Sequence, residues 1–305
     1  MSSVNRHRVI DTLAISAGSM FFPKYFRNKV ESVSFEEHLQ AVKIQVPVIE
    51  AEQTCEMTAE TLVGELNSAL RLAQWKGSDY PSIIYHHGAS EIPFDYGFKN
   101  IFPFSKVDIE ANLFLVRAPF HAQRKDFLGG MAATENWLAM KAVSLHVIEQ
   151  TIGQIRLTSG QPILVGGTSL GGFITNLHHV HFNSADVYTP LLAGLAMDDA
   201  FLNSVYSKSV AASAKRQPEI MKELFDFQPS FDACGHSHDN VFPLLGRHDA
   251  IIRFQQQKAS YSGLAVEVID KGHTTGALAY DALREHMLKY LERNSSDLKR
   301  EAAVV

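Results

Sequence analysis

The chain is organised around one segment, Pro162-Ile-Leu-Val-Gly-Gly-Thr-Ser-Leu-Gly-Gly-Phe-Ile174. It begins with an apolar segment typical of a buried strand, passes through Gly167-Thr-Ser169-Leu-Gly171, and ends in small and apolar residues that suit a helix. A nucleophilic serine requires this order, because it must stand on a tight turn between a strand and a helix. A helix that begins directly after Ser169 also directs backbone N–H groups and the positive end of its dipole toward that position.

Two side chains that can assist a serine follow Ser169 in chain order. His273 comes directly after the apolar segment 264–269, and its ordinary pKa of about 6.5 suits a general base at neutral pH. Asp249 comes directly after the apolar segment 240–245 and is the candidate acid that orients the histidine. The alternative role of Asp249 is to cap a helix that begins just after it.

Asp198 and Asp199 are the other candidates for the acid, since they follow the apolar segment one strand earlier. We prefer Asp249 because it stands on a short turn directly after a buried strand. Two adjacent carboxylates repel each other and stay hydrated, which makes them poorer partners for one histidine.

The alternation of apolar and amphipathic segments predicts the α/β class, with a mostly parallel central sheet flanked by helices on both faces. We expect the 305 residues to form one domain. Residues 58–75 carry leucines at helical spacing and predict a further helix, which ends at Gly77. The other predicted strands are 81–85, 111–117, 162–166, 190–197, 240–245 and 264–269, and the other predicted helices of the main pattern are 131–152 and 275–293.

Two parts of the chain do not follow this alternation. In the N-terminal extension, residues 1–57, Ser34-Phe-Glu-Glu37 is typical of a capping box, and residues 43–50 alternate like an edge strand. Residues 199–238 are longer than a simple crossover needs, and helices are predicted over 201–215 and 218–227. This segment is expected to form a small helical cap over the site, or else a peripheral helix pair.

The motifs resemble those of the α/β-hydrolase-fold serine hydrolases, of the esterase and lipase type. The resemblance covers residues 80–293 and depends on His87-Gly88 after an early strand, the Gly-x-Ser-x-Gly turn, and Asp249 and His273 after the last two strands. It implies that Ser169 attacks a carbonyl carbon, that His273 is the base, and that Asp249 orients the base.

The same resemblance implies an oxyanion hole made of the backbone N–H groups of Ala89 and Leu170, and no metal or organic cofactor. The early loop departs from one esterase branch, because His87-Gly88-Ala89 contains a single glycine instead of a run of three. The branch therefore stays open.

These observations predict a serine hydrolase that cleaves a carboxylic ester or thioester through an acyl-enzyme intermediate. A serine peptidase would use the same residues, and a non-catalytic binding or scaffold protein could keep the same fold. Phe94, Phe98, Phe102 and the cap predict a preference for a small-molecule substrate with an apolar acyl group.

The composition further narrows the classes of function and the cellular location that we expect. A net charge of −5 and an isoelectric point near 6.3 offer no basic surface for nucleic acid. Two cysteines, Cys55 and Cys234, form no disulfide framework, so we expect a reducing, cytoplasmic location. Asp11 interrupts the apolar N-terminal stretch, which makes a signal peptide and a membrane span unexpected. The oligomeric state stays open.

The remaining histidines fall into three groups. His86 and His87 adjoin the predicted oxyanion loop and are expected to shape it. His178, His179 and His181 could bind a metal ion, but a solvated or interface patch is the favoured interpretation. The run Cys234-Gly-His-Ser-His-Asp239 has the residue types of a metal site, yet it lacks the second half that a structural zinc site needs. We therefore predict no metal.

Overall fold

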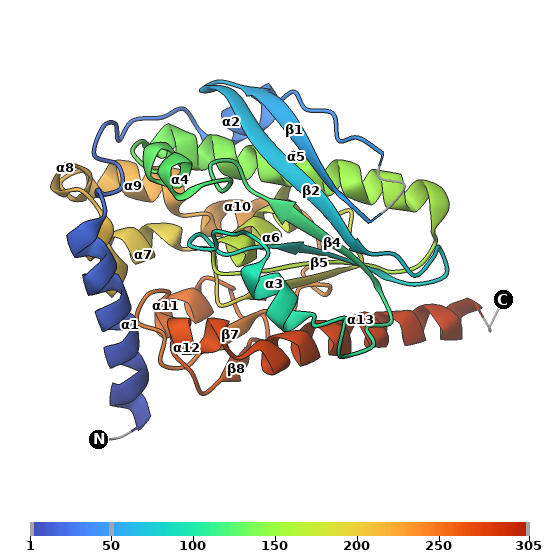
Figure 1. The fold of residues 1–305 in the computed structure, drawn as a ribbon. Helices are drawn as coiled ribbons and strands as arrows, with labels where there is room; N and C mark the ends of the chain where they lie inside the picture. Colours follow the sequence, from blue (N-terminus) through green and yellow to red (C-terminus); the bar gives the residue numbers. More distant parts are fainter. Residues whose placement is uncertain (1–2, 49–51, 303–305) are drawn as a thin grey trace.

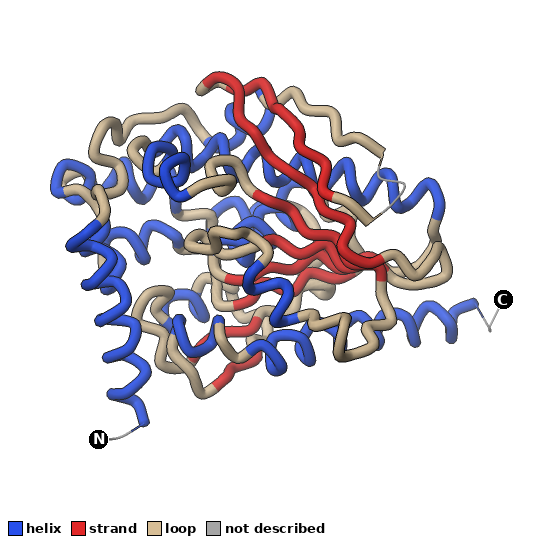
Figure 2. Tube along the Cα trace, viewed as in Figure 1, coloured by secondary structure: helices blue, strands red, loops and turns tan. Residues whose placement is uncertain are grey.

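The central feature of the computed structural model, which describes residues 3–48 and 52–302, is one eight-stranded sheet with the strand order β1-β2-β4-β3-β5-β6-β7-β8. The first two pairings, β1 with β2 and β2 with β4, are antiparallel, and all other neighbours are parallel. Figure 1 shows the arrangement of the elements, and Figure 2 shows the strands of the sheet in red. The prediction of a mostly parallel sheet is confirmed. The strands are β1 (Thr54–Thr61), β2 (Gly64–Gln74), β3 (Ser82–His86), β4 (Asn112–Arg117), β5 (Ile163–Thr168), β6 (Val187–Leu191), β7 (Leu244–Gly246) and β8 (Glu267–Ile269).

Helices cover both faces of the sheet. Adjacent strand residues point to opposite faces, so Ile84 and Val165 pack on the side of α5 and α6, while Ile83 and Leu164 pack on the side of α3 and α13. The helices are α1 (Ser3–Phe21), α2 (Phe35–Ala41), α3 (Tyr96–Ile101), α4 (Arg124–Gly130), α5 (Thr134–Thr158), α6 (Leu170–His181), α7 (Met197–Leu202), the 3₁₀ helix η1 (Val205–Ser209), α8 (Ala212–Lys215), α9 (Pro218–Phe225), α10 (Gln228–Ala233), α11 (Phe254–Ala259), α12 (His273–Ala277) and α13 (Tyr280–Ala302).

The predicted helix over residues 58–75 is wrong, because this stretch is the β1–β2 hairpin. The spacing of four between Leu66 and Leu70 fits a helix but also fits a strand, in which every second residue shares a face. Ser68 and Leu72 are buried on the same face and complete the strand pattern. The turn is Leu62-Val63, and β2 begins directly after it at Gly64, whose φ of +98° favours glycine.

Several predicted boundaries also differ, and the strands predicted over 240–245 and 264–269 are shortened to β7 and β8. The strand predicted over 190–197 ends earlier, since Leu192 has a φ of +52° and turns the chain out of the sheet. The helix predicted over 201–215 is broken at Ser204, whose side chain accepts the Tyr206 N–H and starts η1 instead. The helix predicted over 275–293 is divided into α12 and α13.

The N-terminal region contains a long helix that the sequence did not predict. Helix α1 lies across the edge toward which the parallel strands point, where it packs against η1 and α12 (Figure 1). The capping box of Ser34 and Glu37 is confirmed at the start of α2. The edge strand predicted over 43–50 is reduced to one antiparallel bridge between Lys43 and Glu60, and its last two residues lie outside the described ones. Among the helices that the structure describes, none has the length and apolar character that crossing a membrane would require.

Candidate active site

Ser169 lies on the turn between β5 and α6, with a φ of +58° and a ψ of −112°. The glycines on either side allow this turn to pass close to the end of β3. A Cβ on Gly167 would lie 2.6 Å from the carbonyl oxygen of His86, and one on Gly171 would lie 2.1 Å from the same atom. Both contacts are too short for a real Cβ, so steric exclusion accounts for both glycines of the Gly-x-Ser-x-Gly pattern.

Ser169, His273 and Asp249 form one chain of hydrogen bonds. The Ser169 Oγ lies 3.0 Å from His273 Nε2, and His273 Nδ1 lies 2.7 Å from Asp249 Oδ2. The other carboxylate oxygen of Asp249 accepts the backbone N–H groups of Ile251 at 2.8 Å and Ile252 at 2.6 Å. Because the carboxylate accepts from Nδ1, the neutral imidazole has its lone pair on Nε2, facing the serine hydroxyl.

Burial and charge shift the pKa values of His273 and Asp249 in opposite directions. Burial alone would lower the pKa of His273, but the carboxylate of Asp249, through its charge and its hydrogen bond, raises it above the ordinary value. Burial raises the pKa of Asp249, and His273 opposes that shift. The net effect is a histidine that holds a proton more strongly than a free imidazole does.

The two alternative acids have other partners. Asp199 is buried and forms a two-point ion pair with Arg253. Burial and the nearby charge of Asp226 raise the pKa of Asp198 to about 6. Of the three candidate aspartates, all within the described residues, Asp249 is the one that the structure brings to His273.

The predicted oxyanion donors Ala89 and Leu170 both line the cavity that contains Ser169 and His273. The Gly88 carbonyl oxygen accepts Nδ1–H of the buried His87 at 2.8 Å and the Glu91 N–H at 3.2 Å. In a trans peptide the N–H points opposite to the C=O, so the Ala89 N–H is turned away from these groups. The Leu170 N–H is the first of α6 and has no partner within its own helix.

Several buried side chains hold this loop, and the sequence indicated only part of the set. His87 Nε2 accepts the Ala118 N–H at 3.0 Å, which places the ring proton on Nδ1, and burial keeps the pKa of this ring well below its usual range. The carboxylate of Glu91 accepts the N–H of Gly88 at 2.9 Å, while His121 Nε2 lies 2.9 Å from the Ala89 carbonyl oxygen. His87 was expected to shape the loop, whereas Glu91 and His121 were not identified.

The hydrogen bonds of Asp11 were not predicted from the sequence. This fully buried carboxylate of α1 accepts the backbone N–H groups of His273 at 2.9 Å, Thr274 at 2.8 Å and Ala250 at 3.1 Å. It therefore joins the loop that carries the histidine to the loop that carries Asp249. Its chance of discovery from sequence was small, because its partners lie more than 230 residues away.

Several solved protein structures are similar to this architecture. No family model and no curated protein sequence matches the chain. Its structure is similar to acylaminoacyl peptidase of Pyrococcus horikoshii (TM-score 0.54, 12% identity, covering 80% of this chain and 42% of that one). It is also similar to acetyl xylan esterase 1 of Thermoanaerobacterium sp. JW/SL YS485 (TM-score 0.52, 12% identity, 86% and 96% coverage) and to DcsB in complex with its substrate analogue (0.55, 13%, 81% and 100%). The chain has the α/β-hydrolase fold.

The resemblance seen in the sequence is thus confirmed at the level of fold. The chain spans 42% of the length of the acylaminoacyl peptidase that it matches. Sequence identities of this size establish the architecture alone.

A cavity of about 620 Å³ opens onto Ser169 and His273 in this α/β-hydrolase fold. One wall comes from α1 and the turn after it, and a second comes from residues 197–209, while residues 212–238 do not line the described cavity. Most of the wall is apolar, including Ile15, Phe22, Phe127, Leu128, Trp137, Phe173, Phe201, Ile251 and Ile252.

The aromatic residues expected to line an acyl pocket lie elsewhere. Phe98 and Phe102 are fully buried in the core between the sheet and α3, and Phe94 packs against that core. The assignment of Phe94, Phe98 and Phe102 to the pocket is therefore wrong. Aromatic side chains of a loop can pack in the core as readily as they can line a pocket, and here they pack in the core.

The histidine group at the end of α6 is not a solvated patch. His178 and His179 are fully buried, and His181 packs its ring 5.2 Å from that of Phe35. His178 Nδ1 lies 3.2 Å from the Tyr188 hydroxyl. The surface interpretation is corrected, because α6 is enclosed by its neighbours at this end.

Proposed function

We propose that this protein is a serine hydrolase that cleaves a carboxylic ester or thioester. The observation that carries the proposal is the hydrogen-bonded chain of Ser169, His273 and Asp249 beside a largely apolar cavity. Such an arrangement activates a serine that is otherwise a weak nucleophile.

In the first half-reaction the Ser169 Oγ attacks the substrate carbonyl carbon while its proton moves to His273 Nε2, 3.0 Å away. The N–H groups of Ala89 and Leu170 would donate hydrogen bonds to the resulting oxyanion. The C–O or C–S bond to the leaving group then breaks, and His273 returns the proton to the departing alcohol or thiol. An acyl group remains on Ser169.

In the second half-reaction water attacks the acyl-enzyme. His273 takes a proton from the water, the bond to the Ser169 Oγ breaks, and the serine recovers its proton, which leaves a carboxylic acid. Asp249 remains ionised throughout, holds the required tautomer and stabilises the imidazolium that forms twice in the cycle.

We further propose that α1 and residues 197–209 together form the lid of the site, since both lie in the cavity wall. Their apolar side chains favour a substrate with an apolar acyl group. The alternative of a peptidase uses the same residues, and a binding or scaffold protein would lack turnover.

A fluorophosphonate probe and a panel of acyl esters, acyl thioesters and peptide amides test the proposal. We expect covalent labelling of the wild type and of Ser209→Ala, whose serine lines the same cavity without a histidine partner, and no labelling of Ser169→Ala. Turnover should be highest on esters or thioesters and fall by roughly 10⁴-fold or more in Ser169→Ala. Faster cleavage of peptide amides would favour the peptidase, and labelling without turnover of any acyl substrate would contradict the proposal.

A further inference from the structure

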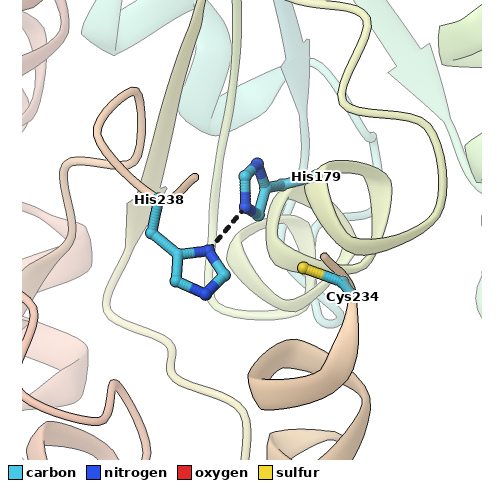
Figure 3. A group of neighbouring side chains, drawn as sticks. All are labelled: His179, Cys234 and His238. Atoms are coloured by element: carbon cyan, nitrogen blue, oxygen red, sulfur yellow. Dashed lines mark hydrogen bonds between the residues drawn. The ribbon is translucent and has the colours of Figure 1, made fainter. Parts of the chain in front are cut away.

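A second group of reactive side chains lies at the opposite end of α6 from Ser169. His179 on the last turn of α6 meets Cys234 and His238 of the segment between α10 and β7. Their ligand atoms all lie within 4.8 Å of one another, and His179 Nε2 lies 2.9 Å from His238 Nδ1. Figure 3 shows the two imidazoles facing each other, with the sulfur of Cys234 directed toward the same space.

The orientation of His179 directs its Nε2 lone pair into this space. Its Nδ1–H donates to Asn183 Oδ1 at 3.0 Å, and the same oxygen accepts from Asn240 Nδ2 at 3.0 Å. The proton of the neutral ring is therefore on Nδ1, and the lone pair of Nε2 points at His238 and Cys234. Metal-binding histidines are usually held in this way, with the second nitrogen donating to a fixed acceptor.

His238 is held by its Nδ1–H, which donates to His179 Nε2 while no metal ion is bound, and by packing. Its ring stacks on Phe231 with a centroid distance of 3.8 Å and an interplanar angle of 10°. This stacking keeps Nδ1 directed at His179. Both imidazoles are thus oriented by neighbours outside the cluster, which reduces the entropy lost when they bind a common ion.

Two imidazole nitrogens and one thiolate are a ligand set that suits Zn²⁺. Zinc binds such atoms at about 2.0–2.3 Å, so tetrahedral ligand atoms lie roughly 3.4 Å apart. The separations here range from 2.9 Å to at most 4.8 Å, so side-chain rotations that change them by at most about 1.4 Å reach that spacing.

We propose that His179, Cys234 and His238 bind one Zn²⁺ ion, with water at the fourth position. The site joins the C-terminal end of α6 to the segment that leads into β7. Since α6 rises about 1.5 Å per residue, the ion lies roughly 15 Å from Ser169 and acts on stability, not on the hydrolytic steps. His236 is exposed, with its ring 6.1 Å from that of His179, and is not part of the set.

Zinc titration of the untagged 305-residue chain tests this proposal, followed by Co²⁺ substitution. We expect one Zn²⁺ per chain, a melting temperature that rises by about 5 °C in excess Zn²⁺, and a thiolate-to-Co²⁺ charge-transfer band. Cys234→Ser and His238→Ala should lose the stoichiometric binding, the thermal shift and the band, whereas the matched variants Cys55→Ser and His236→Ala should keep all three.

The folded state of each variant is checked in EDTA, where Cys234→Ser should melt as cooperatively as the wild type. Equal Zn²⁺ binding by the wild type and Cys234→Ser would overturn the proposal, as would the absence of 1:1 binding in the wild type. Loss of binding in His236→Ala to the same extent would overturn the three-residue ligand set.

Discussion

Replacing Asp11 with Asn tests whether α1 positions His273, the proposed base. The Asp11 carboxylate accepts three backbone N–H groups, two from the His273 loop and one from the Asp249 loop. An Asn side chain has one oxygen, so at least one of these N–H groups would face an NH₂ group, and the remaining bonds would lose their charge assistance.

The size of the effect follows from these contacts. A hydrogen bond to a charged group contributes about 1.5–3 kcal/mol, so the loss of one should lower the free energy of unfolding by about 2 kcal/mol. The effect on catalysis should be larger, because a shift of the His273 ring by about 1 Å costs roughly 100-fold in rate. We expect kcat/KM on the best ester to fall about 100-fold.

The pH profile separates positioning from simple loss of stability. The charge of Asp11 contributes to the raised pKa of His273, so Asp11→Asn should move the acidic limb of kcat/KM to lower pH. Asp186→Asn is the matched control, because Asp186 also accepts a backbone N–H, that of Ile163 at 2.7 Å, and pairs with Arg156 far from the site.

Stability is measured by urea unfolding, and activity is compared well below both melting temperatures. A positioning role for Asp11 is refuted if Asp11→Asn destabilises the fold as Asp186→Asn does while kcat/KM stays within about threefold of the wild type and the acidic limb does not move.

Three further predictions concern the site itself. Asp249→Asn should lower kcat by roughly 10⁴ through the wrong imidazole tautomer, whereas Asp198→Asn should change it far less; equal losses in variants of matched melting temperature would contradict this assignment. Burial lowers the pKa of His273, but Asp249 raises it by more than burial lowers it. We therefore expect kcat/KM to increase with pH through a midpoint above 6.5, as His273 loses its proton; a midpoint below 6.5 would contradict the pairing of His273 with an ionised Asp249. In a series of straight-chain esters each added methylene should contribute about 0.8 kcal/mol, or roughly fourfold in kcat/KM, until the cavity of about 620 Å³ is full; rates independent of chain length would argue against an apolar acyl site.

The features that the sequence predicted well are those with local causes. The Gly-x-Ser-x-Gly turn is recognisable because a Cβ at Gly167 or Gly171 would collide with the end of β3, so the residue types themselves report the backbone path. Asp249 and His273 each follow an apolar strand segment, and the carboxyl ends of parallel strands meet at one edge of a sheet. Chain order and strand pattern together were therefore enough to anticipate this neighbourhood.

The prediction was wrong where the spacing of apolar residues fits both a helix and a strand. Leucines four residues apart in 58–75 satisfy a helix and a strand alike, and only pairing with β4 decided for the hairpin. The aromatic residues after β3 posed a similar ambiguity, because the same side chains suit a core or a pocket, and packing against α13 placed them in the core.

By itself, the sequence determined the serine turn, the α/β alternation and the strand ends that carry Asp249 and His273, since each depends on residues adjacent in the chain. Only the tertiary structure decided that α1 forms a wall of the cavity, that Asp11 joins two loops more than 230 residues away, and that His179 supplies the partner missing from the Cys234–His238 run. The physical reason is that a carboxylate accepting distant N–H groups, or an imidazole facing a distant thiol, leaves no periodic or spaced pattern in its own segment. Those contacts exist only once burial of the apolar faces has brought the segments together.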